Sequence, residues 1–133
     1  MVTAVDTNII IGILIADDRF GSHSLSMVRR ASAEGKLIVC EVVWAELTAF
    51  LGGRSDPLRI AQGFNLEYDP MNNEAAEKAG ELYAKYRAAG GKREHMVADF
   101  LVAGHSFLQS DRLRTRDRGF YRKYLRELPL MLS

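Results

Sequence analysis

The sequence near the N-terminus reads Val2-Thr3-Ala4-Val5-Asp6-Thr7-Asn8-Ile9-Ile10-Ile11, in which three polar residues separate two apolar runs. The run before Asp6 has the length of a short buried strand, and the run from Ile9 to Ile15 is long enough to start a helix. Thr7 or Asn8 is expected to cap that helix. The stretch therefore predicts a strand, a sharp turn and a helix, with Asp6 at the exit of the strand.

The same alternation continues along the chain. Strands are expected at 37–40, 64–68, 112–115 and 128–132, and helical segments at about 25–34, 42–51, 73–89 and 96–108, with shorter ones opening at Asp56-Pro57 and at 118–121. Strands that alternate with helices and lack hairpin turns indicate a parallel sheet covered on both faces. We therefore expect one α/β domain over residues 1–133, a three-layer α/β/α sandwich around a central parallel β-sheet.

The amino-acid composition favours a globular protein with a hydrophobic core of its own. The chain has 133 residues and is 47% hydrophobic, which suffices for a core without disulfides or metal staples. Its single cysteine, Cys40, ends an apolar run and is expected to be buried and inert, and the lack of a disulfide framework favours a reducing cytoplasm. Asp6 and Asn8 interrupt the apolar N-terminal segment and no basic region precedes it, so neither a signal peptide nor a membrane span is expected.

Charge is distributed unevenly along the chain. The net charge is +1, but residues 1–80 hold 7 basic and 11 acidic side chains, whereas residues 81–133 hold 11 and 6. Candidates for contact with a phosphate backbone are Arg112, Arg114, Arg116, Arg118 and Arg122. A solvated basic surface explains the same charges equally well.

Four acidic residues stand at unusual positions. Asp6 and Asp117 each follow an expected strand, and Glu46 and Asp99 each lie on the apolar face of an expected helix. Simple explanations remain open for three of them: Asp6 and Asp117 could cap the helical turns that follow, and Glu46 could be solvated at the edge of its stripe or paired with an arginine. For Asp99 a solvated helix face is difficult to find.

Taken together, the four acids indicate a metal site. Carboxylates brought close to one another repel strongly unless a cation neutralises them, and ligands that are all oxygen favour Mg²⁺ or Mn²⁺. The four residues span more than a hundred positions, so their convergence depends on the fold.

Four short motifs, in this order and spacing, resemble those of PIN-domain ribonucleases, and within them the VapC-type toxins of prokaryotic toxin–antitoxin pairs. The motifs are Val5-Asp6-Thr7-Asn8, Ala45-Glu46-Leu47, Ala98-Asp99-Phe100-Leu101-Val102-Ala103 and Thr115-Arg116-Asp117-Arg118-Gly119-Phe120. The resemblance covers nearly the whole chain. It implies a PIN-like fold and hydrolysis of single-stranded or looped RNA.

By matching position, the resemblance assigns Asp6, Glu46, Asp99 and Asp117 to a site for Mg²⁺ or Mn²⁺. Asn8 and Thr115 match polar positions that orient carboxylates or water, a role that ordinary capping can mimic. The resemblance also implies a small antitoxin protein as partner and a homodimer.

Three other functions fit the sequence less well. A phosphatase with Asp6 as nucleophile is expected to carry a second acid where Asn8 stands, and a dinucleotide-binding domain needs a glycine-rich first turn that Asp6-Thr7-Asn8 does not provide. A catalytically idle PIN-like module that binds RNA or protein would more readily have lost one of the four acids. His23 and His105 show no ligand spacing and are expected to be structural.

Overall fold

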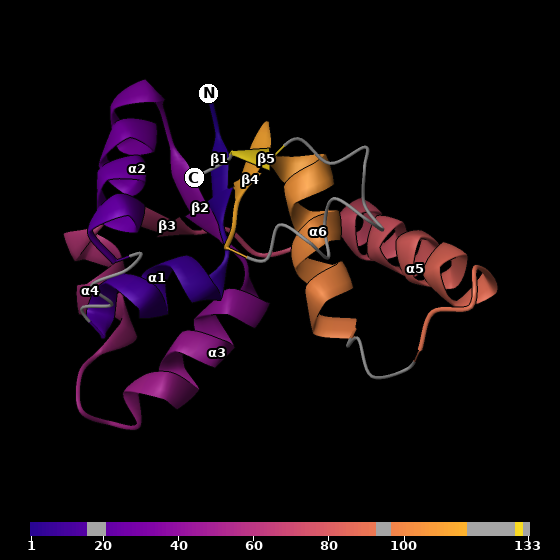
Figure 1. The fold of residues 1–133 in the computed structure, drawn as a ribbon, viewed down its shortest axis with the longest axis horizontal. Coiled ribbons are helices and arrows are strands. Elements are labelled where there is room, and N and C mark those ends of the chain that lie inside the picture. The colour runs from indigo at the N-terminus through magenta and orange to yellow at the C-terminus, as the bar shows by residue number, and fades with distance from the viewer. Residues whose placement is uncertain (16–20, 93–96, 117–129, 132–133) are drawn as a thin grey trace.

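The computed structural model describes residues 1–15, 21–92, 97–116 and 130–131 (Figure 1). Its strands are β1 (Thr3–Val5), β2 (Leu37–Val39), β3 (Leu66–Tyr68), β4 (Arg112–Arg114) and β5 (Leu130–Met131). Its helices are α1 (Thr7–Leu14), α2 (Gly21–Glu34), α3 (Glu41–Leu51), α4 (Pro57–Gly63), α5 (Asn73–Ala88) and α6 (Val97–Gln109). The elements follow the predicted order, and the helical turn expected at 118–121 lies outside the described residues.

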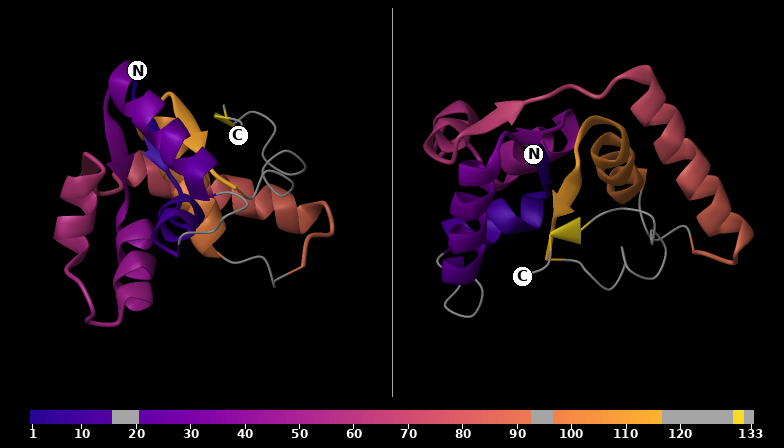
Figure 2. Two further views of the ribbon diagram at one scale, coloured as in Figure 1. Left: turned by 60° about the vertical axis from the view of Figure 1, so that its left-hand side comes forward. Right: turned by 90° about the horizontal axis from the view of Figure 1, so that it is seen from above.

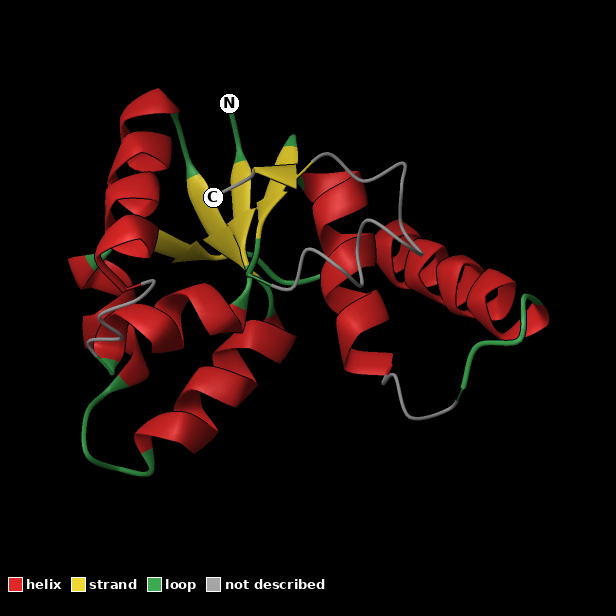
Figure 3. Cartoon of the chain, viewed as in Figure 1, coloured by secondary structure: helices red, strands yellow, loops and turns green. Residues whose placement is uncertain are grey.

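The strands form one sheet in the order β3-β2-β1-β4-β5, and every neighbouring pair is parallel. The first strand of the chain therefore lies at the centre. In the β1–β4 pair, Val5 stands opposite Arg114, so the residues that follow both strands emerge side by side. Figure 3 shows the strands converging at this carboxyl end. The prediction of an α/β fold with a central parallel sheet is confirmed.

Helices lie on both sides of the sheet. In the view of Figure 1, α2 and α4 lie to the left of the strands, α6 and α5 to the right, and α1 and α3 beyond the carboxyl end. The second view in Figure 2 shows α6 next to the sheet and α5 outside it. The core between these layers contains Ile9, Ile38, Val43, Phe100 and Leu113, all almost fully buried. None of the described helices is both long and apolar enough to cross a membrane.

The ends of the helices follow the local sequence. Asp56 caps α4 by accepting a hydrogen bond from the Leu58 amide, and Pro57 occupies the first helical position as predicted. Gly52 ends α3 in the left-handed conformation, with a φ of 54°. The cap of α1 differs from the expectation of Thr7 or Asn8: it is Asp6, which accepts from the Thr7 amide at 2.8 Å. The helix begins immediately after the strand because this carboxylate satisfies its first N–H.

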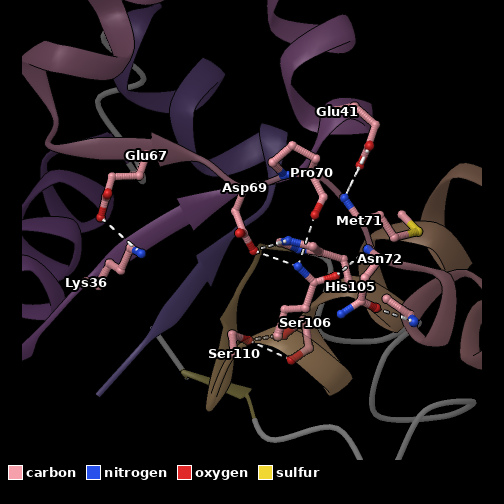
Figure 4. A network of polar contacts seen from close by, with 12 residues as sticks. Lys36, Glu41, Glu67, Asp69, Pro70, Met71, Asn72, His105, Ser106 and Ser110 are labelled. Atoms are coloured by element: carbon pink, nitrogen blue, oxygen red, sulfur yellow. Dashed lines mark hydrogen bonds and ion pairs between the residues drawn. The ribbon is translucent and has the colours of Figure 1, made fainter.

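The loop between β3 and α5 is fixed by side chains from other elements (Figure 4). His105 of α6 is buried and its Nε2 lies 2.9 Å from Oδ2 of Asp69, the residue after β3. Gln109, one turn further along α6, donates to the same Asp69 oxygen and accepts from the Asn72 amide. Glu41, at the start of α3, accepts from the Met71 amide. This loop thus joins α6 and α3 to the carboxyl edge of the sheet, and His105 is structural as predicted.

Helices α5 and α6 pack against each other unusually closely at one glycine. A Cβ atom added at Gly104 would lie 2.5 Å from the Ala75 carbonyl oxygen and 2.8 Å from the Ala79 Cβ. The contact therefore depends on small residues on both helices.

Candidate active site

Asp6 occupies the carboxyl end of the central strand. Its backbone N–H donates to the Arg114 carbonyl at 2.9 Å, which extends the β1–β4 pairing by one residue and fixes the direction of the side chain. The side chain is only 8% exposed. Both carboxylate oxygens accept hydrogen bonds, Oδ1 from the Thr7 amide and Oδ2 from the Thr115 hydroxyl at 2.9 Å. Asp6 is therefore both a helix cap and a buried charge at the edge of the sheet.

The electrostatic surroundings of Asp6 are unfavourable to its charge. Burial raises the pKa of Asp6 from 3.8 to about 6, against the lowering effect of the hydrogen bonds from Thr115 and Thr7. The negative charges of Asp99 and Glu46 raise the pKa further. Three of the four predicted acids thus act on one another across this site, although Asp6 and Asp99 are separated by most of the sequence.

Glu46 reaches the site from α3. Its Oε1 accepts from the Thr7 hydroxyl at 2.8 Å, so the residue after Asp6 holds the carboxylate of a second acid. Of the positions that the sequence left open for Glu46, the structure shows the solvated one at the edge of the apolar stripe. The buried face of α3 consists of Val43, Leu47 and Leu51, one position further along, and Glu46 is exposed on its flank. A carboxylate there keeps contact with water while it faces Asp6.

Asp99 lies in the first turn of α6, the helix next to β4. It is partly buried, and the next residue, Phe100, is fully buried. A carboxylate in a first helical turn is favoured by the helix dipole, which offsets part of the repulsion from the other acids. Asp99 therefore reaches the site from α6, a different helix from the one that carries Glu46.

Asn8 and Thr115 connect α1 to the end of β4. The Asn8 side chain donates to Thr115 Oγ1 at 3.4 Å and to Asp6 Oδ2 at 3.5 Å, and its carbonyl oxygen accepts from the Arg116 amide at 3.0 Å. Thr115 is fully buried, and its hydroxyl donates a hydrogen bond to Asp6. Both residues thus contact the Asp6 carboxylate, and their role in orienting it toward a metal stays a prediction.

Of the five arginines predicted to contact RNA, the structure describes Arg112, Arg114 and Arg116. Arg112 starts β4, at the opposite edge from Asp6, where it pairs with Glu34 at 2.7 Å. Arg114 has no exposed surface. Neither placement suits contact with RNA. Arg116 is partly buried beside the acids. Asp117, Arg118 and Arg122 lie outside the described residues.

Two residues at the site carried no recognisable signal in the sequence. Thr7 was expected only as a possible cap, because nothing local indicates that its hydroxyl meets a side chain 39 positions away. Gly12 resembles an ordinary small residue of an apolar helix, yet a Cβ added there would lie 2.5 Å from Nη1 of Arg116.

The donor set fits a hard divalent cation. Carboxylate oxygens are its preferred ligands, and the charges of Asp99 and Glu46 add to the effect of burial in raising the pKa of Asp6. Within the described residues, no three acidic, histidine or cysteine side chains lie close enough together to complete a metal site. The four-acid site proposed from the sequence additionally needs Asp117.

Comparison with known proteins agrees with this architecture. The family model described as PIN domain matches residues 3–125. Among solved structures, VapBC2 from Rickettsia felis bound to a promoter DNA fragment is similar at a TM-score of 0.75 and 18% identity, over 98% of both chains. VapBC-1 from nontypeable Haemophilus influenzae gives 0.71 and 16%, over 98% of this chain and 97% of that one. FitAcB from Neisseria gonorrhoeae gives 0.68 and 15%, over 98% and 96%.

Because the sequence identities are only 15 to 18%, the similarity to these solved structures shows a shared fold and nothing more. A comparison with curated proteins found no match. The family model, however, spans nearly all of the sequence, including the positions of all four predicted acids and the strand exits that carry Asp6 and Thr115. The chain therefore belongs to the PIN domain family.

Proposed function

We propose that this protein is a metal-dependent endoribonuclease that cuts single-stranded or looped RNA and serves as the toxin of a toxin–antitoxin pair. The observation that carries the proposal is the buried Asp6 carboxylate, which faces the charges of Asp99 and Glu46 at the carboxyl edge of a parallel sheet. In such sheets ligands bind beyond the carboxyl ends of the strands. A cluster that destabilises the fold at this position is best explained by binding of a cation.

Asp6, Glu46 and Asp99, with Asp117, would hold Mg²⁺ or Mn²⁺. When bound, the ion supplies a water of lowered pKa and neutralises charge on the phosphoryl oxygens. The chain's own residues keep the ligands in place: Thr115 and the Thr7 amide fix the two oxygens of Asp6, and the Thr7 hydroxyl fixes Glu46. Because both oxygens of Asp6 accept hydrogen bonds, the residue suits a fixed ligand better than the attacking group of a phosphatase.

Cleavage assays test the nuclease activity directly. Purified protein is expected to cut RNA with Mg²⁺ or Mn²⁺ and to lose this activity in excess chelator. Asp6→Asn, Glu46→Gln and Asp99→Asn are each expected to lower kcat/KM by a hundredfold or more, on the order of 3 kcal/mol at the transition state. Glu77→Gln, an exposed acid of α5, is the matched control and should cleave as the wild type does.

Two results would reject this assignment. Cleavage that persists in chelator excludes the metal mechanism, and full activity of Asp99→Asn excludes the site. RNA binding without any cleavage would instead identify a catalytically idle PIN module.

A toxin of this kind also needs a protein partner that neutralises it. The three similar structures named above include two VapBC complexes, and their chains match this one over nearly its whole length. We propose a small antitoxin as partner, a cytoplasmic location and a homodimeric nuclease. Expression of the wild type should arrest growth, Asp99→Asn should not, and co-expression of the protein encoded by the neighbouring reading frame should restore growth. Light scattering of the purified protein tests the dimer.

A further inference from the structure

A groove between α1 and α3 leads away from the acidic cluster. Its volume is about 520 Å³, and Glu46 lies at the end nearest Asp6. One wall is apolar and is formed by Ile11, Ile15 and Ala49. Ile15 is 56% exposed, which is high for a large aliphatic side chain next to a polar site. The groove thus offers apolar surface next to the Glu46 carboxylate.

The side chain of Arg116 also lines the groove, and it lies against Gly12 of α1. A Cβ atom added at Gly12 would meet Arg116 at Nη1 (2.5 Å), Cζ (3.6 Å) and Cδ (3.7 Å), and these are its three nearest neighbours. The guanidinium therefore lies directly against the backbone of α1. Any side chain at position 12 would push it away without moving the backbone, because only the flexible end of Arg116 is in contact.

From this arrangement we infer that the groove is a nucleotide subsite for the RNA substrate, an inference that rests on the proposed function. The Arg116 guanidinium binds a backbone phosphate next to the scissile one, and the base of that nucleotide packs on Ile11, Ile15 and Ala49. Guanidinium groups bind phosphate through paired hydrogen bonds, and bases pack on apolar surfaces without sequence preference. A cationic group beside an apolar surface matches the two parts of a nucleotide, and the groove reaches Glu46, one of the carboxylates that would act on the next phosphate.

Gly12 gives a test that separates this role from a structural one. Alanine is the better helix former, so Gly12→Ala should leave the melting temperature unchanged or raise it. At the same time it should displace the guanidinium and weaken RNA binding. Gly80→Ala in α5, where no atom lies within 4 Å of the added Cβ, is the matched control.

Binding of a labelled single-stranded RNA of mixed sequence is measured by fluorescence anisotropy in chelator at several salt concentrations. Gly12→Ala and Arg116→Ala should each raise Kd roughly threefold to tenfold and reduce the slope of log K against log salt by about 0.7, the value for one lost phosphate contact on a single strand. The double variant should bind no more weakly than Arg116→Ala alone. Gly80→Ala should bind as the wild type does.

The outcomes distinguish the two levels of proposal. A wild type that neither binds nor cleaves RNA rejects the proposed function and the subsite with it. A wild type that cleaves RNA while Gly12→Ala binds it normally rejects the subsite alone, as do additive losses in the double variant. If Gly12→Ala binds RNA normally but weakens binding of the antitoxin, the groove is a protein-binding site and the nucleotide assignment is wrong.

Discussion

At the scale of single residues, Asp6 combines two opposing effects. It begins α1 by capping the Thr7 amide, and it carries a charge that burial and two neighbouring acids disfavour. The first effect stabilises the fold and the second destabilises it. A substitution that keeps the cap and removes the charge separates them.

Asp6→Asn is expected to stabilise the metal-free protein. The pKa of Asp6 is raised in the folded state, so its ionised form destabilises the fold above about pH 6, and this loss disappears as the pH falls toward 3.8. In chelator near pH 8, Asp6→Asn should raise the free energy of unfolding by up to about 3 kcal/mol, with little difference from wild type near pH 4. Urea unfolding at both pH values measures this. A variant less stable than wild type at both would show that the hydrogen bonds of Asp6 outweigh its charge.

The sequence predicted some of these residues better than others. Asp6 and Thr115 follow strands, and strand exits can be found from apolar runs alone. For Glu46 the sequence left open whether the side chain is buried or solvated, because α3 carries apolar side chains at both Val42 and Val43, and the choice between the two stripes depends on the packing partner. The role of Thr7 depends on a contact with another helix, which local pattern does not encode.

At the scale of secondary structure, the closely packed pair of α5 and α6 supports the helix that carries Asp99. Polar residues that follow β3 hold the other end of this helix through His105 and Gln109. Capping residues and glycine stops allowed the ends of these helices to be predicted within a few residues. The close approach of α5 and α6 was not predicted, because it requires that small residues of the two helices, Gly104 on one and Ala75 and Ala79 on the other, face each other in the packed structure.

Gly104→Ala is expected to destabilise the protein, although alanine favours helix formation. The added Cβ would lie 2.5 Å from the Ala75 carbonyl oxygen, so the two backbones must move apart. Overpacking of this kind typically costs about 1 to 3 kcal/mol. Gly80→Ala, on the facing helix with free space around it, should instead be neutral or stabilising. Thermal melts of both variants make the comparison, and equal melting temperatures would contradict the close packing.

At the scale of the whole molecule, stability and metal binding should be linked. A cation that binds only the folded state raises its stability, and the proposed cation would be held by three carboxylates, from the end of β1, from α3 and from α6. Millimolar Mg²⁺ should raise the melting temperature of the wild type and raise that of Asp99→Asn much less. The melting temperature of Glu77→Gln should rise as much as that of wild type. An equal rise in all three proteins would indicate a general salt effect.

The order of the strands also has a consequence for synthesis. Asp6 lies on the central strand, and its partner Thr115 follows 109 residues later. At roughly 5 to 20 residues per second, a ribosome needs about 5 to 20 s to progress from one to the other. Until then the chain lacks the strand that completes the site. On the proposed function, a nascent chain is therefore expected to be unable to cut its own message during most of translation.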